Sequence, residues 1–276
     1  MKRIIPLAAL LMIFTIPWAC LALDHPGGFM TTSQTWYAAN NPHRVLAPIY
    51  VHSPSAPLLT IEPGCVVQFA AGASLLIGDI SLDEPGDLSA VGTMGNPIVF
   101  TSAGAAQPGA WGEIRFQNSI GPASAMRWCE LSYGGNGGNG GMVYCHVQVP
   151  PVENCIFEQS STTGIRIWDA AATPLDTRIS NCTFLDNLSF PIQLKGLYVS
   201  LIGTGNTYSG NTPDQIQVLG DYIDRNVTWE NQGIPYRIDS FLVVHGVGGA
   251  TLTLRPGIHM LFEQNGYLRV GDTSLS

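Results

Sequence analysis

The sequence has few charged residues and almost no lysine. Charged side chains make up 12% of its 276 residues, about half the usual share, and Lys2 and Lys195 are its two lysines. The formal net charge is −8. Binding to nucleic acid or to an anionic membrane surface needs clustered cations, so we expect neither as a partner.

Helical periodicity is also missing. No long segment repeats apolar residues at helical spacing, whereas 31 glycines, 19 prolines and 45% apolar residues indicate many turns around a large core. Short alternating runs, such as Leu59-Thr60-Ile61 before the Pro63-Gly64 turn, are typical of strands. The composition therefore predicts an all-β chain.

Patterns for metal binding and acid–base catalysis are missing as well. The chain has no Cys-x-x-Cys pair, no His-containing ligand spacing and no Asp-Asp pair. The glycine-rich stretch 134–141 has no carboxylate that could bind calcium, and we expect a loop there. We therefore predict no catalytic residue, no metal ligand and no cofactor.

The first residues have the features of a secretory signal peptide. Lys2 and Arg3 precede an apolar run from Ile4 to Ala19, and small residues follow at the cleavage position. We predict a signal peptide over residues 1–22 and a secreted or cell-surface protein. No membrane insertion is expected after its removal.

Five cysteines remain beyond that segment, namely Cys65, Cys129, Cys145, Cys155 and Cys182. The number is odd, so at least one thiol has no partner within the chain. Two interpretations stay open: small buried apolar residues in a stack, which we favour, or a disulfide between two of them.

One short unit occurs twice between Val152 and Leu194. Asn154-Cys155-Ile156-Phe157 and the following Ile165-Arg166-Ile167 recur 27 residues later as Asn181-Cys182-Thr183-Phe184 and Ile192-Gln193-Leu194. Similar runs begin at Ile114, Met142, Ile165, Ile192 and Ile216, and Cys129, Cys155 and Cys182 form a second column. A unit this short cannot bury its apolar face alone, so the spacing predicts stacked coils, a β-solenoid.

A longer repeat relates two distant parts of the chain. Residues 35–79 match residues 228–272 at a shift of 193, with 14 identities over 45 ungapped positions. We predict an unpaired lead-in over residues 23–34 and one large unit over residues 35–227. Residues 228–276 would then be the start of a second homologous unit, or an end cap.

These motifs resemble a known family. The Leu59–Gly64 run with Phe69, the Pro97–Thr101 strand, and Trp111-Gly112 with Ile114-Arg115-Phe116 form one part, and the Asn-Cys-x-Phe coils form the other. Together, over roughly residues 35–276, they resemble bacterial secreted right-handed parallel β-helix proteins of the pectin-lyase-like superfamily. The resemblance implies that fold, a side-chain amide ladder at Asn154 and Asn181 with Trp128 in the preceding place, and function on an outer strand face.

Alternation along the strands predicts which residues form that face. If Ile114, Met142, Ile165, Ile192 and Ile216 point inward, one outward column is Arg115, Val143, Arg166, Gln193 and Gln217, and the next is Gln117, Cys145, Trp168, Lys195 and Leu219. Arg166, Trp168, Gln193 and Lys195 are then expected to form one patch, which is our candidate binding site.

The patch combines an aromatic ring, two cations and an amide, which suit a sugar ring and its hydroxyl or carboxylate groups. We therefore predict a non-catalytic binding, adhesion or structural module that contacts a polysaccharide or cell-surface glycan. The alternative is a polysaccharide lyase or glycoside hydrolase acting on an acidic glycan, with calcium as a cofactor under the lyase alternative. Such enzymes need acidic calcium ligands or paired carboxylates, and neither falls on this face.

Overall fold

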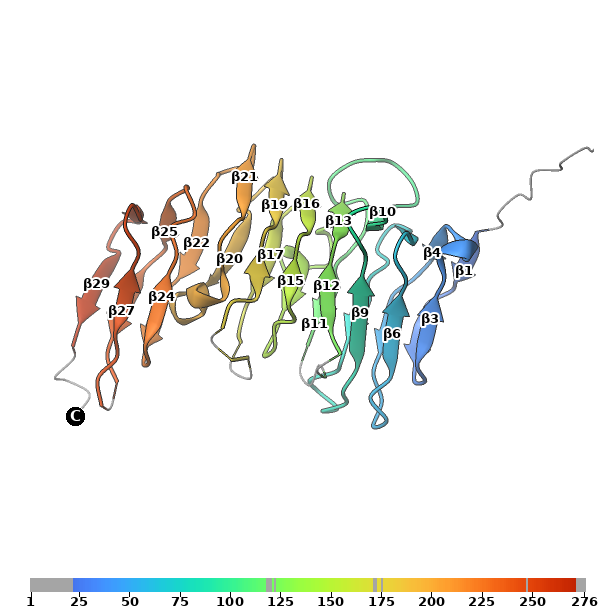
Figure 1. The fold of residues 1–276 in the computed structure, drawn as a ribbon, viewed down its shortest axis with the longest axis horizontal. Helices are drawn as coiled ribbons and strands as arrows, with labels where there is room; N and C mark the ends of the chain where they lie inside the picture. Colours follow the sequence, from blue (N-terminus) through green and yellow to red (C-terminus); the bar gives the residue numbers. More distant parts are fainter. Residues whose placement is uncertain are drawn as a thin grey trace, which may run out of the picture.

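The computed structural model describes residues 22–271, except 118–120, 122, 171, 172, 175 and 247. The predicted signal peptide lies outside the described residues, apart from its last position. The described chain winds into a parallel β-helix whose coils follow one another along the long axis, from β1 to β29 (Figure 1). Strands of successive coils pair in parallel throughout, which confirms the predicted fold class.

Three long sheets form the sides of the helix, and we name them sheets A, B and C. Sheet A contains β1 (Leu23–His25), β4 (His43–Val45), β7 (Val66–Phe69), β10 (Ile98–Ser102), β13 (Cys129–Ser132), β16 (Ile156–Glu158), β19 (Thr183–Leu185) and β21 (Thr207–Ser209). Sheet B contains β2 (Gly28–Met30), β5 (Ile49–Val51), β8 (Leu75–Ile77), β11 (Ile114–Phe116), β14 (Gly141–Cys145), β17 (Thr163–Ile167), β20 (Ile192–Lys195), β22 (Ile216–Leu219), β25 (Tyr236–Ile238) and β28 (Met260–Phe262). Sheet C contains β3 (Gln34–Trp36), β6 (Leu58–Ile61), β9 (Asp87–Val91), β12 (Ala125–Arg127), β15 (Val152–Glu153) and β18 (Ile179–Ser180).

Two smaller sheets complete the C-terminal coils. Sheet D contains β23 (Asp221–Ile223), β26 (Phe241–Val244) and β29 (Tyr267–Val270), and sheet E contains β24 (Val227–Trp229) and β27 (Leu252–Leu254). Two 3₁₀ helices, η1 (Ala38–Asn40) and η2 (Gly196–Leu201), lie between strands. In the part of the chain described, no helix has the length and apolarity needed to cross a membrane.

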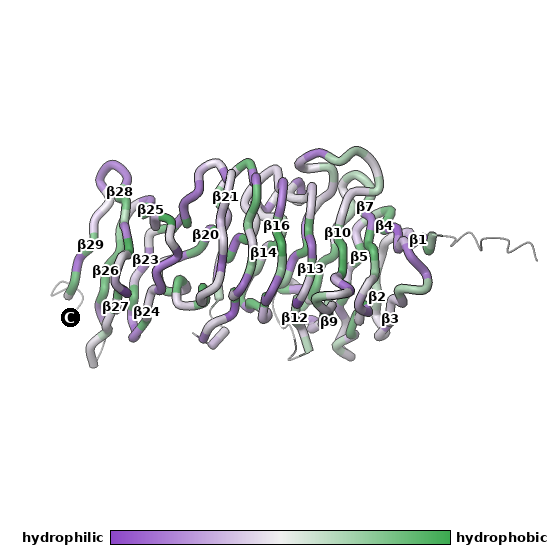
Figure 2. The backbone as a smooth tube through the Cα atoms, turned by 45° about the horizontal axis from the view of Figure 1, so that its top comes forward, coloured by the Kyte–Doolittle hydropathy of each residue, from purple (hydrophilic) through white to green (hydrophobic). Residues whose placement is uncertain are grey.

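Alternation within each strand builds the core. In β17, Ile165 and Ile167 are fully buried, while Arg166 between them is half-buried. Burial of each Ile stabilises the fold by about 1.5–3 kcal/mol through the hydrophobic effect. Apolar residues recur in this way in the strands of successive coils (Figure 2). Rings also stack along the axis, with centroids 5.1 Å apart for Phe157 and Phe184. The core is therefore a continuous column inside the helix.

The expected inward register is correct at four of the five predicted positions and wrong at one. Ile165 pairs with Ile192 as predicted, but the residue between Ile114 and Ile165 in that column is Val143, not Met142. Val143 and Cys145 are therefore buried core residues, and the outward residue between them is Tyr144. The sequence is ambiguous here because Met142 and Val143 are both apolar, so alternation fits either register.

The cysteine column agrees with the favoured interpretation. Cys129, Cys155 and Cys182 occupy equivalent positions of three coils, and all five described cysteines are buried and free. Burial raises the pKa of Cys65 to about 11, and it raises the pKa of Cys145 further. These thiols behave as small apolar core residues rather than nucleophiles.

The predicted lead-in is wrong in one respect: residues 23–34 are not unpaired. β1 pairs with β4 and β2 pairs with β5, so within the described residues the first coil starts at Leu23. The strand pattern in the sequence is weak here because Gly27 and Gly28 interrupt the alternation of apolar and polar residues. Both glycines have positive φ in the structure.

The 193-residue shift also relates strand pairings. Leu23 pairs with His43 in β1 and β4, and their equivalents Ile216 and Tyr236 pair in β22 and β25. The same holds for the pairings of β2 with β5 and of β23 with β26. The structural equivalence thus extends 12 residues further toward the N-terminus than the sequence match that begins at Thr35 and Thr228.

The two copies lie in different sheets. β1, β4 and β7 belong to sheet A, whereas their equivalents β22, β25 and β28 belong to sheet B. Between the copies, η2 and a single bridge from Ile179 to Ile202 stand where other coils have a strand of sheet C. From β1 the chain takes seven steps along sheet A to reach β21, and β22 follows in sheet B, so the 193-residue shift corresponds to seven coils and one further side.

Candidate functional site

The outer face of sheet B concentrates the cations of an acidic chain. One outward row runs across the coils as Tyr50, Leu76, Arg115, Tyr144, Arg166, Gln193, Gln217 and Arg237. A second row, one alternation further along each strand, contains His146, Trp168 and Lys195. Stacked strands lie about 4.8 Å apart, so these side chains form a continuous surface, except at Leu76, which is buried.

The structure brings the four predicted site residues together. Arg166 lies opposite Gln193 on the neighbouring strand. The Arg166 guanidinium carbon is 5.2 Å from the ring centroid of Trp168, and the Lys195 Nζ is 6.0 Å from it. Trp168 remains 42% exposed. The ring therefore contacts two cations, and part of its surface is open to solvent.

Several contacts hold this patch in place. Arg166 Nη1 donates a hydrogen bond to the carbonyl oxygen of Asn139 at 2.8 Å, and each cation–π contact contributes about 0.5–2 kcal/mol. Within the described residues, neither Arg166 nor Lys195 forms an ion pair with a carboxylate. Lys195 nevertheless lies close enough to Asp221 to lower the pKa of that carboxyl, against the larger effect of burial. The positive charge of Arg166 is therefore available to a ligand, and that of Lys195 is shared with Asp221.

An amide row continues the patch toward the C-terminal coils. Gln193 Nε2 donates to Gln217 Oε1, and Gln217 Nε2 donates to Asp239 Oδ2 at 2.7 Å. Burial raises the pKa of Asp239 despite this hydrogen bond. Gln193 Oε1 is buried without a hydrogen-bond partner, so this row leaves one acceptor unsatisfied.

Sequence reasoning missed Tyr144 and His146, which extend the patch toward the N-terminal coils. Tyr144 lies between Arg115 and Arg166 on neighbouring strands, and its ring centroid is 6.3 Å from that of His146. Burial raises the pKa of the Tyr144 phenol. The correct pairing of Val143 with Ile114 and Ile165 would have identified both residues from the sequence.

Sequence reasoning also missed Glu113, one residue before β11. Its side chain is 1% exposed; its Oε1 accepts a hydrogen bond from Asn139 Nδ2 at 2.6 Å and lies 3.3 Å from Arg115 Nε. Burial raises the pKa of this carboxyl. The glycine-rich loop covers it: a Cβ at position 137 would collide with the Glu113 carboxyl group, so the loop needs glycine there.

The predicted amide ladder is at a different corner of the helix. Asn154 and Asn181 do occupy equivalent places, with φ of 56° and 53°, but no hydrogen bond joins their side chains. The bonded row is Ser160, Asn187 and Asn211, where Asn187 Nδ2 donates to Asn211 Oδ1 at 2.7 Å and Asn187 Oδ1 accepts from the Ser160 N–H at 3.0 Å. Ser160, Asn187 and Asn211 follow one another at 27 and 24 residues, the same steps as the coils.

Other candidate groups do not join the face. Arg178 pairs with Asp176 at 2.7 Å beside sheet C. Among the residues described, no three His, Cys, Asp or Glu side chains are placed to hold a metal ion. No family model, no curated protein and no solved structure matches the chain.

Proposed function

We propose that this protein is a secreted or cell-surface β-helix module that binds an acidic polysaccharide on the outer face of sheet B. The observation that carries the proposal is the exposed ring of Trp168 in contact with Arg166 and Lys195, neither of which forms a salt bridge with a described carboxylate. The location rests on the N-terminal signal pattern, and membership of the pectin-lyase-like superfamily rests on the sequence motifs. Both belong to the proposal.

The chemistry of the patch suits a uronic-acid chain. An aromatic ring packs against the apolar C–H face of a sugar, and guanidinium and ammonium groups bind its carboxylate. The side chains are already held on stacked strands, so little conformational entropy is lost on binding.

The first prediction concerns the patch itself. Trp168→Ala and Arg166→Ala should each weaken binding of an oligogalacturonate by about five- to tenfold, because each removes a contact of about 1–1.4 kcal/mol. Isothermal titration calorimetry measures both affinities. Tyr222→Ala and Arg44→Ala are matched controls, since Tyr222 is exposed elsewhere and Arg44 pairs with Asp24 at 2.7 Å on sheet A. Weakening by the controls alone would place the site elsewhere.

A second candidate function is cleavage of an acidic glycan. Glu113 with its raised pKa, and Tyr144 between Arg115 and Arg166, are ionisable groups at one end of the face. Incubation with oligogalacturonate, with and without calcium, tests this candidate. New absorbance from an unsaturated uronide, lost in Tyr144→Phe, would establish a lyase; its absence leaves the binding function.

A further inference from the structure

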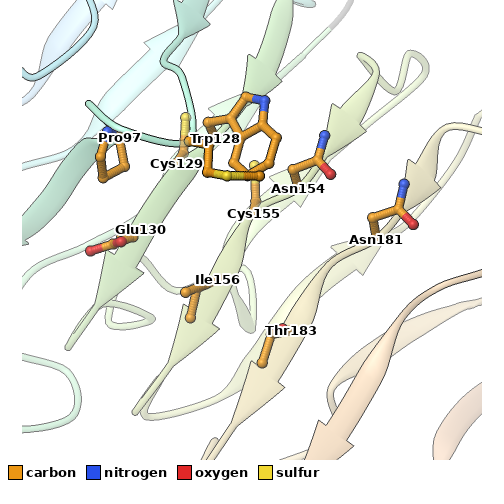
Figure 3. Close-up of a pocket in the computed structure, with 10 residues that line it drawn as sticks. Pro97, Trp128, Cys129, Glu130, Asn154, Cys155, Ile156, Asn181 and Thr183 are labelled. Carbon is orange, nitrogen blue, oxygen red and sulfur yellow. The ribbon is translucent and has the colours of Figure 1, made fainter.

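A groove of about 260 Å³ runs along the corner between sheets C and A. Two rows of side chains border it (Figure 3). Trp128, Asn154 and Asn181 form the corner row, each just before a strand of sheet A, and Glu130, Ile156 and Thr183 form the strand row on β13, β16 and β19. The groove therefore presents one residue of each row in each of three successive coils.

The backbone of the corner row is left-handed in all three coils. Asn154 and Asn181 tolerate this conformation, but Trp128, with φ of 51°, is a bulky residue in a region that L side chains avoid. Backbone hydrogen bonds hold the corner, including Trp128 N–H to the Glu153 carbonyl at 3.1 Å. Asn would fit better here, so an indole held in strain at the surface indicates a role for its ring.

The two amides of the corner row are free. Asn154 is half-buried and Asn181 is exposed, and the side chains of both lack hydrogen-bond partners within the described structure. Asn187, one corner away, is fully buried and satisfied by three partners. Each free amide offers one acceptor and two donors along the groove.

We propose that this groove binds a neutral, linear oligosaccharide. Trp128 offers a flat face for a sugar ring, and the two amides with Glu130 offer acceptors and donors to hydroxyl groups. No cation lines the groove, and nearby Arg127 pairs with Glu153 at 2.9 Å. An anionic ligand is therefore disfavoured here, in contrast to the face of sheet B.

The spacing of the contacts favours a sugar chain over a peptide. Successive coils repeat about every 4.8 Å, which is close to the advance per hexose in a linear chain. An extended peptide presents side chains on one side about every 6.6–6.8 Å, so it would lose register within three coils. The inference does not rest on the proposed function, because it concerns a different corner, different residues and a ligand of different charge.

The experiment is calorimetric titration with β-1,4-linked glucose and N-acetylglucosamine hexamers, with a proline-rich peptide of similar length as comparator. Trp128→Asn should weaken hexamer binding by about five- to tenfold, while raising the thermal midpoint by roughly 2–4 °C through relief of backbone strain. Asn154→Gly keeps the left-handed backbone and removes the amide, and should weaken binding about two- to tenfold. Asn265→Gly, at φ of 67° elsewhere, and Trp168→Ala should leave binding unchanged.

Three results would overturn the inference. These are no binding of either hexamer by the native protein, binding that survives both Trp128→Asn and Asn154→Gly, or peptide binding at this groove in place of hexamer binding. A measured thermal midpoint of Trp128→Asn at or above that of the native protein shows that a loss of binding in that variant is not caused by unfolding. Oligogalacturonate binding by Trp128→Asn, measured in the same way, tests the face of sheet B independently of the groove.

Discussion

Adjacent residues of one strand have opposite roles, and β17 shows this most clearly. Ile165 lies in the fully buried core, while Arg166 reaches the outer face and contacts Asn139 and Trp168. The same division separates Ile192 from Gln193 in β20. A single step along the chain therefore moves a side chain from the buried core to the outer face.

Substitutions on the two sides of the strand test this division. Ile165→Asp or Ile192→Asp should lower the free energy of unfolding by about 3–5 kcal/mol, because each places an uncompensated charge in the core. Gln193→Asp, beside the cation Arg166, should change it by less than about 1 kcal/mol. Chemical denaturation of the three variants gives the comparison. Equal stability in all three would show that the register is wrong.

At the scale of the element, the first coil contains a cluster of three rings. The ring centroid of Trp36 is 4.1 Å from that of His25 and 5.2 Å from that of His43, and the two imidazoles, 5.4 Å apart, share a hydrogen bond of 3.1 Å. Burial, with a contribution from His43, lowers the pKa of His25 to about 4. The folded first coil therefore favours a neutral imidazole at His25.

This shift predicts a pH dependence. Between its ordinary pKa of 6.5 and its folded pKa of about 4, His25 takes up a proton in the unfolded chain but not in the folded one. Its contribution to stability is therefore complete above about pH 6.5 and declines as the pH falls toward 4.

Thermal unfolding of His25→Gln tests the point. Because burial raises the pKa of Glu113 and gives a slope of opposite sign, the native and variant curves must be compared. The variant should lose less stability between pH 6.5 and 4 than the native protein. The exposed His259, replaced in His259→Gln, is the control. Parallel curves for native and His25→Gln proteins would contradict the prediction.

The individual strands also show which parts of the structure can be predicted from the sequence. Period-two alternation and the 27-residue step predict the columns through Ile165 and Ile192, and hence the patch of Arg166 and Trp168. They cannot choose between Met142 and Val143, because both registers keep apolar residues inward. They also cannot reveal Glu113, whose burial depends on a loop that follows it by some 20 residues and packs back over it.

At the scale of the whole molecule, the two equivalent segments differ in what covers them. Leu75 in β8 and Leu268 in β29 are equivalent by shift and by register. β11 covers Leu75, which is fully buried, whereas Leu268 is 39% exposed. In the described structure, β29 has no strand on its outer side. The same residue type thus has two environments in one fold.

This pair provides a matched comparison of coil stacking. Leu75→Ala should cost about 2–5 kcal/mol, as expected for a buried leucine. Leu268→Ala should cost less than about 1 kcal/mol, because solvent already reaches that side chain. Denaturant unfolding of both variants measures the difference. Similar costs at the two sites would mean that a further layer covers β29 in solution.

The central claim is that the outer face of sheet B binds an acidic glycan through Arg166, Trp168 and Lys195. The most direct measurement is the affinity of the native protein for oligogalacturonate by calorimetry, at low and at physiological salt, alongside an Arg166→Ala/Lys195→Ala double variant. The account predicts native binding that weakens with added salt, and an affinity at least about tenfold lower in the double variant. No native binding, or binding that neither salt nor the double substitution weakens, would contradict it.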